Sequence, residues 1–535
     1  MSVLPYATLQ PTYPAVFDEI ASASIATDKV WLSLYALNAP SSSIHARVWL
    51  EPCKPASAEQ ANTEEGTERA AGVRIAKVDG KVTVKRVKGS STDLLVSTTS
   101  SELNSSTSAR TAQSQVLYAP TLLRAPRKDF GSIIRGHEGA TALDVASSTA
   151  VPGLERYVAG GADGALRIGV LDVPKEDETI DESVKGADEQ GEIEKLAQRR
   201  IRERARQLQR EQVIPCKGHV GDIRSAQFFP SGDVILSTSS DHTARIWDAK
   251  DGTCVRVLKG HSRAVLCAAP IGRGRQVVTG GGDGTLRIYD VGEDKQIGLI
   301  GSDRYSSVNV ISLRPESVFP TSDQPAQSTS VPTLAAGLAS GKVQLFDLKS
   351  KSSIGLIDTH SFPLGSPPAA TDTWAQLSKS GGITALAWID QHTLITGTTE
   401  GVCSLHDVRK LGPGSTEIDD TTSDASVSIE GLEANAGPPC LLSTWRRNGA
   451  AITDIRVDTS KASLGQVDVL VATSDGLPYR ADISKLLLGA AGSRATAPRV
   501  TVEYTGWEAE NVGTIRLDGK GRVLCAGAEG MLKRY

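Results

Sequence analysis

The chain has 535 residues, a net charge of -4 and a pI near 6.1. It is therefore longer than one ordinary domain and lacks the clustered excess of positive charge that nucleic-acid binders need. Its seven cysteines are scattered without a CxxC pair, which argues against a disulfide framework or a zinc site and indicates a reducing compartment.

The N-terminal segment predicts a small β-rich module over residues 1–98. It has no basic stretch followed by an apolar core, so no signal peptide is expected. No run in the chain approaches the ~18 apolar residues of a membrane-spanning helix. Strand-like runs include VWLSLYAL, SIHARVWLE and VRIAKVDGKVTVKRV. Residues 99–117 are polar and low in complexity and predict a linker. We expect a protein of the cytoplasm and nucleus with no membrane partner.

A charged insertion occupies residues 174–212. Its first half is acidic and its second half, LAQRRIRERARQLQREQ, is basic and rich in helix formers. The prediction is a solvated helix that protrudes between the first two repeats described below. The alternative is a basic helix that binds a partner protein. Aromatic residues for base stacking are absent from the insertion, so nucleic acid is not an expected partner.

A repeat begins at residue 218. Residues 218–248 read GHVGDIRSAQFFPSGDVILSTSSDHTARIWD, and residues 260–290 repeat the pattern with a period of 42. In each copy an Asp lies 22 positions after the His, and an aromatic residue follows six positions later. β-Branched runs alternate with turn sequences such as PSGD, which is typical of a four-stranded propeller blade. The matching residues are His219, Asp241 and Trp247, then His261, Asp283 and Tyr289.

Five weaker copies raise the count to seven. Upstream, the unit at RGHEGATALDV contains His137 and Asp163, with Gly169 at the aromatic position. Downstream, the aromatic position holds Phe346, His406, Ala481 and Tyr535. The predicted fold is all-β, a seven-bladed WD40 β-propeller over residues 118–535 preceded by the small β-rich module. Because the chain stops inside the last unit, we predict that DFGSIIRG, ahead of the first GH, pairs with it and closes the ring.

The residue types of a hydrolase triad occur in the first strong copy, as His219, Ser237 and Asp241. A nucleophilic serine must be exposed beside an oxyanion hole, and one active site does not need two copies of its triad. We therefore predict a hydrogen-bond network inside each blade, with no catalytic residue, cofactor or metal ligand. The network residues are His137, Asp163, His219, Ser237, Asp241, Trp247, His261, Thr279, Asp283 and Tyr289.

Residues 214–300, above all FFPSGDVILS, resemble the central WD repeats of the proteasomal ATPase-associated factors, called regulatory-particle assembly chaperones in fungi. DKVWLSLYAL, YAPT at 118–121 and the terminal GAEGMLKRY resemble other segments of that family. The resemblance implies a non-catalytic chaperone that binds the C-terminal domain of a proteasomal AAA+ ATPase subunit. It also implies a role in assembling the base of the 19S regulatory particle, and a monomer outside that complex.

Loop residues just before the inner strands are the candidate partner-binding face: Asp222, Arg263 and Asp454. The acidic pair would face a basic ATPase surface, and Arg263 would suit a peptide or phosphopeptide. Solvated loop charges are the alternative interpretation of all three. The alternative function is a generic WD40 scaffold in a ubiquitin-ligase, ribosome-assembly or transcription complex, because a propeller does not specify its partner. An enzymatic function would need a cluster of polar residues in the central channel, and the sequence shows none.

Overall fold

The structure is a computed structural model of the 535-residue chain. It describes residues 2–36, 39–53, 73–80, 82–87, 90, 92–98, 121–133, 139–147, 149, 154–172, 213–315, 333–359, 381–411, 440–462, 465–487, 497–507 and 509–535. The predicted linker at 99–117, the insertion at 174–212 and His137 lie outside the described residues.

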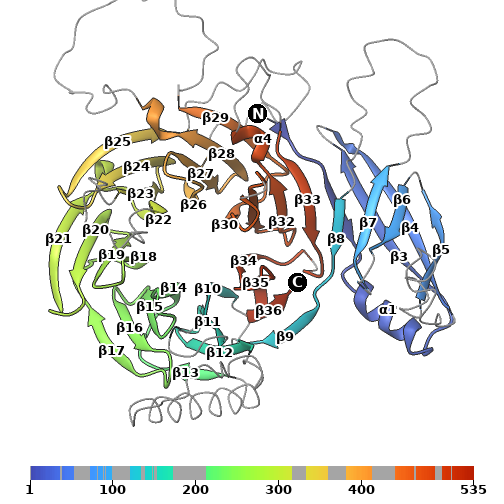
Figure 1. The fold of residues 1–535 in the computed structure, drawn as a ribbon, viewed down its shortest axis with the longest axis horizontal. Coiled ribbons are helices and arrows are strands. Elements are labelled where there is room, and N and C mark those ends of the chain that lie inside the picture. Colours follow the sequence, from blue (N-terminus) through green and yellow to red (C-terminus); the bar gives the residue numbers. More distant parts are fainter. Residues whose placement is uncertain are drawn as a thin grey trace, which may run out of the picture.

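Seven antiparallel blades stand around a central axis, which confirms the predicted propeller (Figure 1). The first three blades are β10(Ala140–Ser147), β11(Glu155–Gly161), β12(Leu166–Asp172), β13(Ile214–Cys216); β14(Ile223–Phe228), β15(Val234–Ser239), β16(Ala244–Asp248), β17(Cys254–Leu258); and β18(Val265–Ile271), β19(Gln276–Gly281), β20(Thr285–Asp290), β21(Lys295–Gly301). Blades four and five are β22(Val308–Leu313), β23(Thr333–Leu338), β24(Lys342–Asp347), β25(Ser352–Asp358); and β26(Ile383–Trp388), β27(Thr393–Thr398), β28(Val402–Asp407), β29(Leu441–Arg446). Blades six and seven are β30(Ile452–Asp458), β31(Asp468–Thr473), β32(Tyr479–Asp482), β33(Arg499–Tyr504); and β34(Val512–Leu517), β35(Val523–Gly527), β36(Met531–Arg534), β9(Lys128–Ser132).

Each seam between neighbouring blades has its own apolar core. Successive side chains of a strand point to opposite faces, so one strand serves two seams. In β15, Ile235 packs into the cluster shared by blades one and two, and Leu236 packs into the cluster shared by blades two and three. Seven such clusters follow one another around the ring. Both faces of a blade are therefore buried, and nearly every residue of the second strands is buried, polar ones included.

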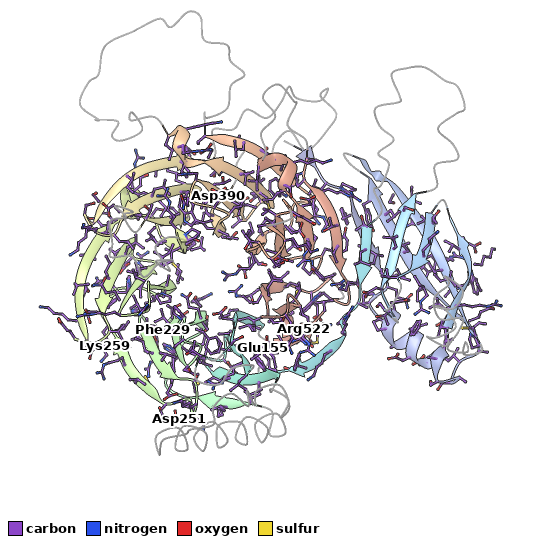
Figure 2. The ribbon with its side chains drawn as sticks, in the orientation of Figure 1. Glu155, Phe229, Asp251, Lys259, Asp390 and Arg522 are labelled. Atoms are coloured by element: carbon purple, nitrogen blue, oxygen red, sulfur yellow. The ribbon has the colours of Figure 1, made fainter. Side chains whose placement is uncertain are left out.

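The ring closes as the sequence predicts. Strand β9 pairs antiparallel with β36, with Ser132 opposite Met531 and Lys128 opposite Arg534. Just beyond β9, the Ile133 amide donates to the Gly530 carbonyl over 3.0 Å, and Ile133 is buried in the cluster between blades seven and one. Across the same seam Arg522 pairs with Glu155 at 3.2 Å (Figure 2). Blade seven thus has an N-terminal outer strand.

The N-terminal region is β-rich and is joined to the propeller by sheet hydrogen bonds. Its elements are β1(Ser2–Val3), β2(Tyr6–Leu9), α1(Tyr13–Ala21), β3(Asp28–Ala36), β4(Ala39–Pro52), β5(Val73–Asp79), β6(Val82–Arg86), β7(Leu94–Thr98) and β8(Thr121–Arg124). Strands β2–β5 form one antiparallel sheet whose apolar face packs against α1. Strand β8 pairs in parallel with β33, so β8, β7 and β6 extend blade six to seven strands. Strand β1 adds to blade five beside β29.

The remaining short elements lie in the propeller. They are α4(Ser484–Leu487) and the 3-10 turns η3(Asp303–Tyr305), η6(Val408–Lys410) and η8(Ala528–Gly530).

A buried ion pair fastens the chain's first strands to blades five and six. Arg447, just after β29, donates to both carboxylate oxygens of Glu503 on β33 over 2.6 and 2.7 Å. The two side chains are 4% and 2% exposed. Glu503 also accepts the Ala7 amide at 3.2 Å, and the Arg447 guanidinium lies 5.4 Å from the Tyr6 ring centre. One ion pair therefore joins three segments that are distant in the sequence.

The first prediction concerns this ion pair. Arg447→Met should lower the free energy of unfolding by about 3–5 kcal/mol, because it leaves the Glu503 carboxylate buried without its cation. The double variant Arg447→Met/Glu503→Met removes both charges and should recover most of that loss. Urea unfolding of the wild type, both single variants and the double variant measures this. A double variant no more stable than Arg447→Met would contradict the argument.

Candidate interaction surface

One face of the ring bears the connections between blades and the turns between second and third strands, and we call it the top face. A backbone hydrogen bond recurs there in six blades, from the turn to the connection that precedes the same blade. The pairs are Ser240 to Asp222, Gly282 to Ala264, Ala339 to Ser307, Thr399 to Gly382, Ser474 to Ala451 and Ala528 to Asn511. The top-face loops are thereby fixed to the blades that they border.

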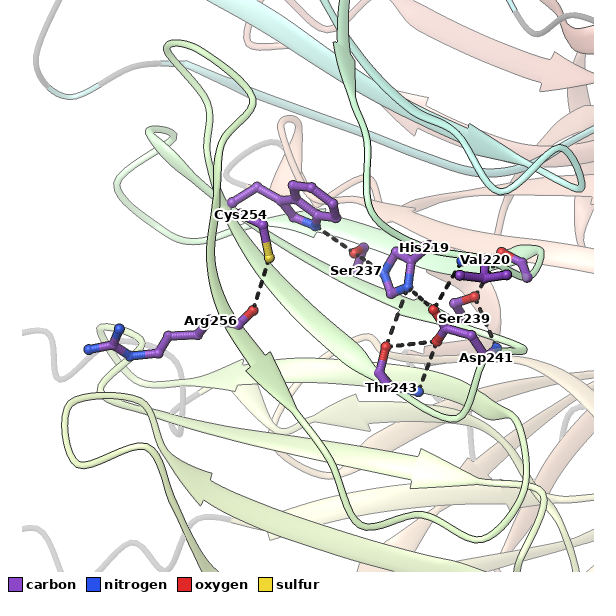
Figure 3. A network of polar contacts seen from close by, with 10 residues as sticks. His219, Val220, Ser237, Ser239, Asp241, Thr243, Cys254 and Arg256 are labelled. Atoms are coloured by element: carbon purple, nitrogen blue, oxygen red, sulfur yellow. Dashed lines mark hydrogen bonds and ion pairs between the residues drawn. The ribbon is translucent and has the colours of Figure 1, made fainter.

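In blade two, the predicted residues form a continuous hydrogen-bond chain (Figure 3). The Trp247 indole nitrogen donates to Ser237 Oγ over 2.7 Å, and Ser237 Oγ lies 2.8 Å from His219 Nε2. On the other side of the imidazole, His219 Nδ1 lies 2.8 Å from Asp241 Oδ2. Because Ser237 accepts from the indole, its hydroxyl donates to Nε2, and the histidine donates from Nδ1 to Asp241. With this order of donors and acceptors, the indole nitrogen, the Ser237 hydroxyl and both imidazole nitrogens each have a partner, and the imidazole is neutral.

Blade three repeats this network with two changes. His261 contacts Thr279 Oγ1 through Nε2 at 2.8 Å and Asp283 Oδ2 through Nδ1 at 3.0 Å. The third-strand residue is Tyr289, whose hydroxyl donates to the Lys259 carbonyl over 3.0 Å. In blade one, Asp163 accepts the Ala165 amide at 3.0 Å and pairs with Arg167 at 2.6 Å.

Burial sets the protonation of these groups. Desolvation lowers the pKa of His219 and His261 below the ordinary value, although a carboxylate faces each ring. Burial opposes the charge of Asp241, but hydrogen bonds from His219 and Thr243 outweigh it and lower the pKa of Asp241 to about 2. His219 and His261 are therefore neutral, and Asp241 and Asp283, whose pKa is likewise lowered to about 2, are charged at physiological pH.

The connectivity of Asp241, His219 and Ser237 is that of a hydrolase triad, but its serine is closed to a substrate. Ser237 is 0% exposed, and the Trp247 indole, also 0% exposed, occupies its oxygen. A nucleophile must reach the reacting carbon and have a donor-lined site for the oxyanion. These three residues can therefore hold the blade together but cannot attack a substrate in this arrangement.

Where the aromatic position lacks an aromatic residue, a neighbour fills the space. A Cβ at Gly169 would overlap the ring of Tyr157, which comes from the adjacent strand β11. In blade six, Tyr479 lies two residues before Ala481, and its hydroxyl accepts the Trp445 indole at 3.3 Å. In blade five, His406 occupies the position with 0% exposure, and burial lowers its pKa to about 4. The three positions lie on third strands, as the six-residue spacing predicts, and beside the small Gly169 the ring of Tyr157 occupies the space.

Blade four holds its connection differently. It has neither the His nor the turn Asp, and Asp303 pairs with Lys342 at 2.8 Å across the same place. Gln344 accepts the Asp303 amide at 2.8 Å and donates to Ser353 over 3.0 Å. An ion pair with one amide side chain thus replaces the His–Asp network.

The three candidate partner-binding residues have different surroundings. Asp222 precedes β14 on the top face and pairs with Arg224 at 3.1 Å, with both side chains well exposed. Arg263 is exposed in the connection before β18. Asp454, in contrast, is the third residue of β30 and not a loop residue ahead of it, because the strand begins at Ile452. Its carboxylate is 17% exposed and pairs with Arg516 of blade seven.

A charged cluster on the inner strands was missed by sequence reasoning. Arg516 on β34 pairs with Asp454 on β30 and lies 3.3 Å from Asp144 on β10. Asp454 also lies 3.7 Å from Arg456, and Asp144 accepts the Phe228 amide at 2.8 Å. The two arginines and two aspartates balance in charge and link blades six, seven, one and two. The sequence did carry one signal for this cluster. The fifth residue of the first strand is charged in three blades, as Asp144, Arg456 and Arg516.

Within the described part of the chain, no helix is long and apolar enough to cross a membrane. In the same residues, no group of three or more His, Cys, Asp and Glu side chains is placed to hold a metal ion.

A family profile for the WD domain, G-beta repeat, matches residues 210–248 and 252–290. These segments contain the braced blades two and three. The chain therefore contains WD repeats, arranged as a propeller.

Similar proteins include nuclear distribution protein PAC1 of Arthroderma otae, 26% identical over 158 residues, which are 26% of this chain and 34% of that protein. The 26S proteasome regulatory subunit RPN14 of Saccharomyces cerevisiae is 44% identical over 59 residues, 11% of this chain and 14% of that protein. Pre-mRNA-processing factor 19 of Bos taurus is 22% identical over 158 residues, 29% of each chain. The chain thus spans about a third or less of the length of these relatives.

The second prediction tests the network of blade two. Ser237→Ala should lower the free energy of unfolding by about 2–4 kcal/mol, because the Trp247 indole and His219 Nε2 both lose a buried partner. Thr279→Val in blade three should cost less, about 1 kcal/mol, because Tyr289 keeps the Lys259 carbonyl. Urea unfolding of both variants provides the comparison. Equal losses would show that the indole bond contributes nothing.

The third prediction is a pH dependence from His406. Its pKa is about 4 in the folded protein and about 6.5 when unfolded, so the unfolded state gains a proton first as the pH falls. Stability present above pH 6.5 is therefore lost on the way to pH 4, by about 2 kcal/mol between pH 7 and pH 5 for this group alone. His406→Phe, which copies Phe346 of blade four, should flatten the pH dependence of the urea midpoint by that amount. An unchanged slope in this variant would contradict the assignment.

Proposed function

We propose that the protein is a non-catalytic scaffold that binds the C-terminal domain of a proteasomal AAA+ ATPase subunit and assists assembly of the base of the 19S regulatory particle. The observation that carries this is the 44% identity over 59 residues to 26S proteasome regulatory subunit RPN14. The longer matches to PAC1 and pre-mRNA-processing factor 19 have only 26% and 22% identity. The resemblance of FFPSGDVILS and of both chain ends to the assembly-chaperone family supports the same partner.

The physical basis of the proposed activity is rigid display. The recurring turn-to-connection hydrogen bonds hold the top-face loops before any partner arrives. The buried His–Asp networks fix the two strongest repeats from within. A surface that is already ordered loses little conformational entropy on binding, so more of its contact energy appears as affinity. Such a protein can hold a folding or assembling subunit without any chemical step.

Of the two predicted carboxylates, Asp222 is better placed than Asp454 for a basic ATPase surface. Its pairing with Arg224 is exposed, and an exposed pair contributes little, so a cation of the partner can replace Arg224. Asp454 is a poorer test residue, because its carboxylate neutralises Arg516 beside Arg456. Reversing Asp454 would disturb the inner strands as well as any contact.

The fourth prediction is the set of co-purifying proteins. Tagged protein purified from cells should recover free subunits of the regulatory-particle base, including an ATPase, without the proteolytic core particle. Recovery of a ubiquitin-ligase, ribosome-assembly or transcription complex with no proteasomal ATPase would instead favour the generic scaffold and reject the proposal.

The fifth prediction concerns Asp222. Asp222→Lys should weaken binding to the purified ATPase C-terminal domain about fivefold or more, mainly through slower association, and should reduce the salt dependence. Glu293→Lys carries the same charge change at an exposed turn on the opposite face and should leave binding unchanged. Calorimetric titration of the wild type and both variants measures the affinities, and unfolding curves check the fold. Equal effects of the two substitutions would place the contact elsewhere.

A further inference from the structure

The connection between blades three and four presents an exposed aromatic side chain on the top face. Tyr305 is 71% exposed, far more than the tyrosines of the seams. It lies in GSDRYSS, where the two preceding connections carry the GH sequence. A large aromatic side chain exposed on a fixed loop is the usual anchor of a protein contact.

The backbone beneath this side chain is strained and firmly held. Arg304 and Tyr305 are consecutive non-glycine residues with φ of 50° and 51°, in the left-handed region. Tyr305 donates its amide to the Ser302 carbonyl at 3.0 Å, and Ser302 Oγ donates to the Ser306 carbonyl at 2.7 Å. The pair between Asp303 and Lys342 holds the loop to blade four. Both side chains are exposed in this conformation, so the loop presents them to solvent.

The turn of blade three supports the loop from below. Gly284 contacts the Tyr305 carbonyl so closely that a Cβ there would collide with it. A Cβ built on Gly282 in the same turn would lie 3.6 Å from the Arg263 Cβ and 3.9 Å from Ser307 Oγ. Arg263 and the loop carrying Arg304 and Tyr305 therefore flank one turn.

The charge of this region is positive. Arg263 and Arg304 are exposed, and neither takes part in an ion pair with another residue that the structure describes. The nearby carboxylates are already engaged, because Asp303 pairs with Lys342 and Asp283 is bound by His261 and the Ser262 amide. Two free guanidinium groups beside an aromatic ring match carboxylates next to apolar side chains.

We infer that Arg263, Arg304 and Tyr305 form a recognition site for an acidic segment of a partner protein, with Tyr305 as the apolar anchor. The site lies at the seam of blades three and four, whereas Asp222 precedes blade two, so it goes beyond the proposed ATPase contact. The segment it fits carries Asp or Glu on both sides of a leucine-like residue. The rigid loop lets this segment bind without ordering the receptor.

Fluorescence anisotropy with defined peptides tests the site on the full-length chain. The probe is a labelled ten-residue peptide of alternating Glu and Leu, compared with versions that carry Gln or Lys in place of Glu. We expect the Glu peptide to bind the wild type at least tenfold more tightly than either version, and to weaken with added salt. Arg263→Glu/Arg304→Glu should abolish this preference, and Tyr305→Gly should weaken binding several-fold.

Two controls keep the result specific. Arg256→Glu/Arg273→Glu makes the same change in net charge away from the site and should keep the preference. Glycine adopts the left-handed conformation without strain, so Tyr305→Gly should show an equal or higher urea midpoint than the wild type. A weakened peptide contact then cannot be ascribed to unfolding.

Three outcomes would overturn the inference. They are equal binding of the Glu and Gln peptides, equal losses in the control and site double variants, and binding of inorganic tripolyphosphate without the Glu peptide, which would assign the arginines to phosphate. Asp222→Lys should leave peptide binding intact, so failure of the ATPase proposal and failure of this site are separate results.

Discussion

Both faces of every blade are apolar, and each face is buried only when another blade covers it. This constraint requires a closed ring, because an open one would expose two such faces and an unpaired strand edge. The seven seam clusters follow from it, and so does the position of β9. A strand from the N-terminal part of the chain completes blade seven and brings Ile133 into the last cluster. Closure is therefore a matter of burial as much as of hydrogen bonding.

Burial of the seams makes an unpaired polar group costly, and the blades pair their central polar groups in different ways. Blades two and three use a neutral histidine between a carboxylate and a hydroxyl. Blade four uses the Asp303–Lys342 pair, and blade one fills the space at Gly169 with the ring of Tyr157. These blades reach paired polar groups and filled volume with different residue types. The weak repeats thus form blades with the same four-strand order as the strong ones.

The number of blades and the closing strand could be predicted from the sequence, because both depend on short spacings and local strand patterns. The network of blade two was predictable for the same reason, since His219 and Asp241 lie 22 positions apart in a repeating unit. The parallel pairing of β8 with β33 was not, because it joins segments about 380 residues apart that carry no shared pattern. The position of Asp454 was missed because its unit has no GH pair to mark where β30 begins.

Exposed charges, unlike buried ones, can be exchanged without unfolding the ring, so specificity for a partner protein can reside in them. The Arg447–Glu503 pair is nearly inaccessible, so neither partner can change alone without leaving a desolvated charge. Asp222 and Arg224 are exposed and weakly coupled, so a partner can break their pairing at small cost. In blade four, the ion pair between Asp303 and Lys342 fixes the connection. The next two residues, Arg304 and Tyr305, stay exposed. Because each loop is held by a few internal bonds, its outward residues can be chosen for a partner while the ring stays the same.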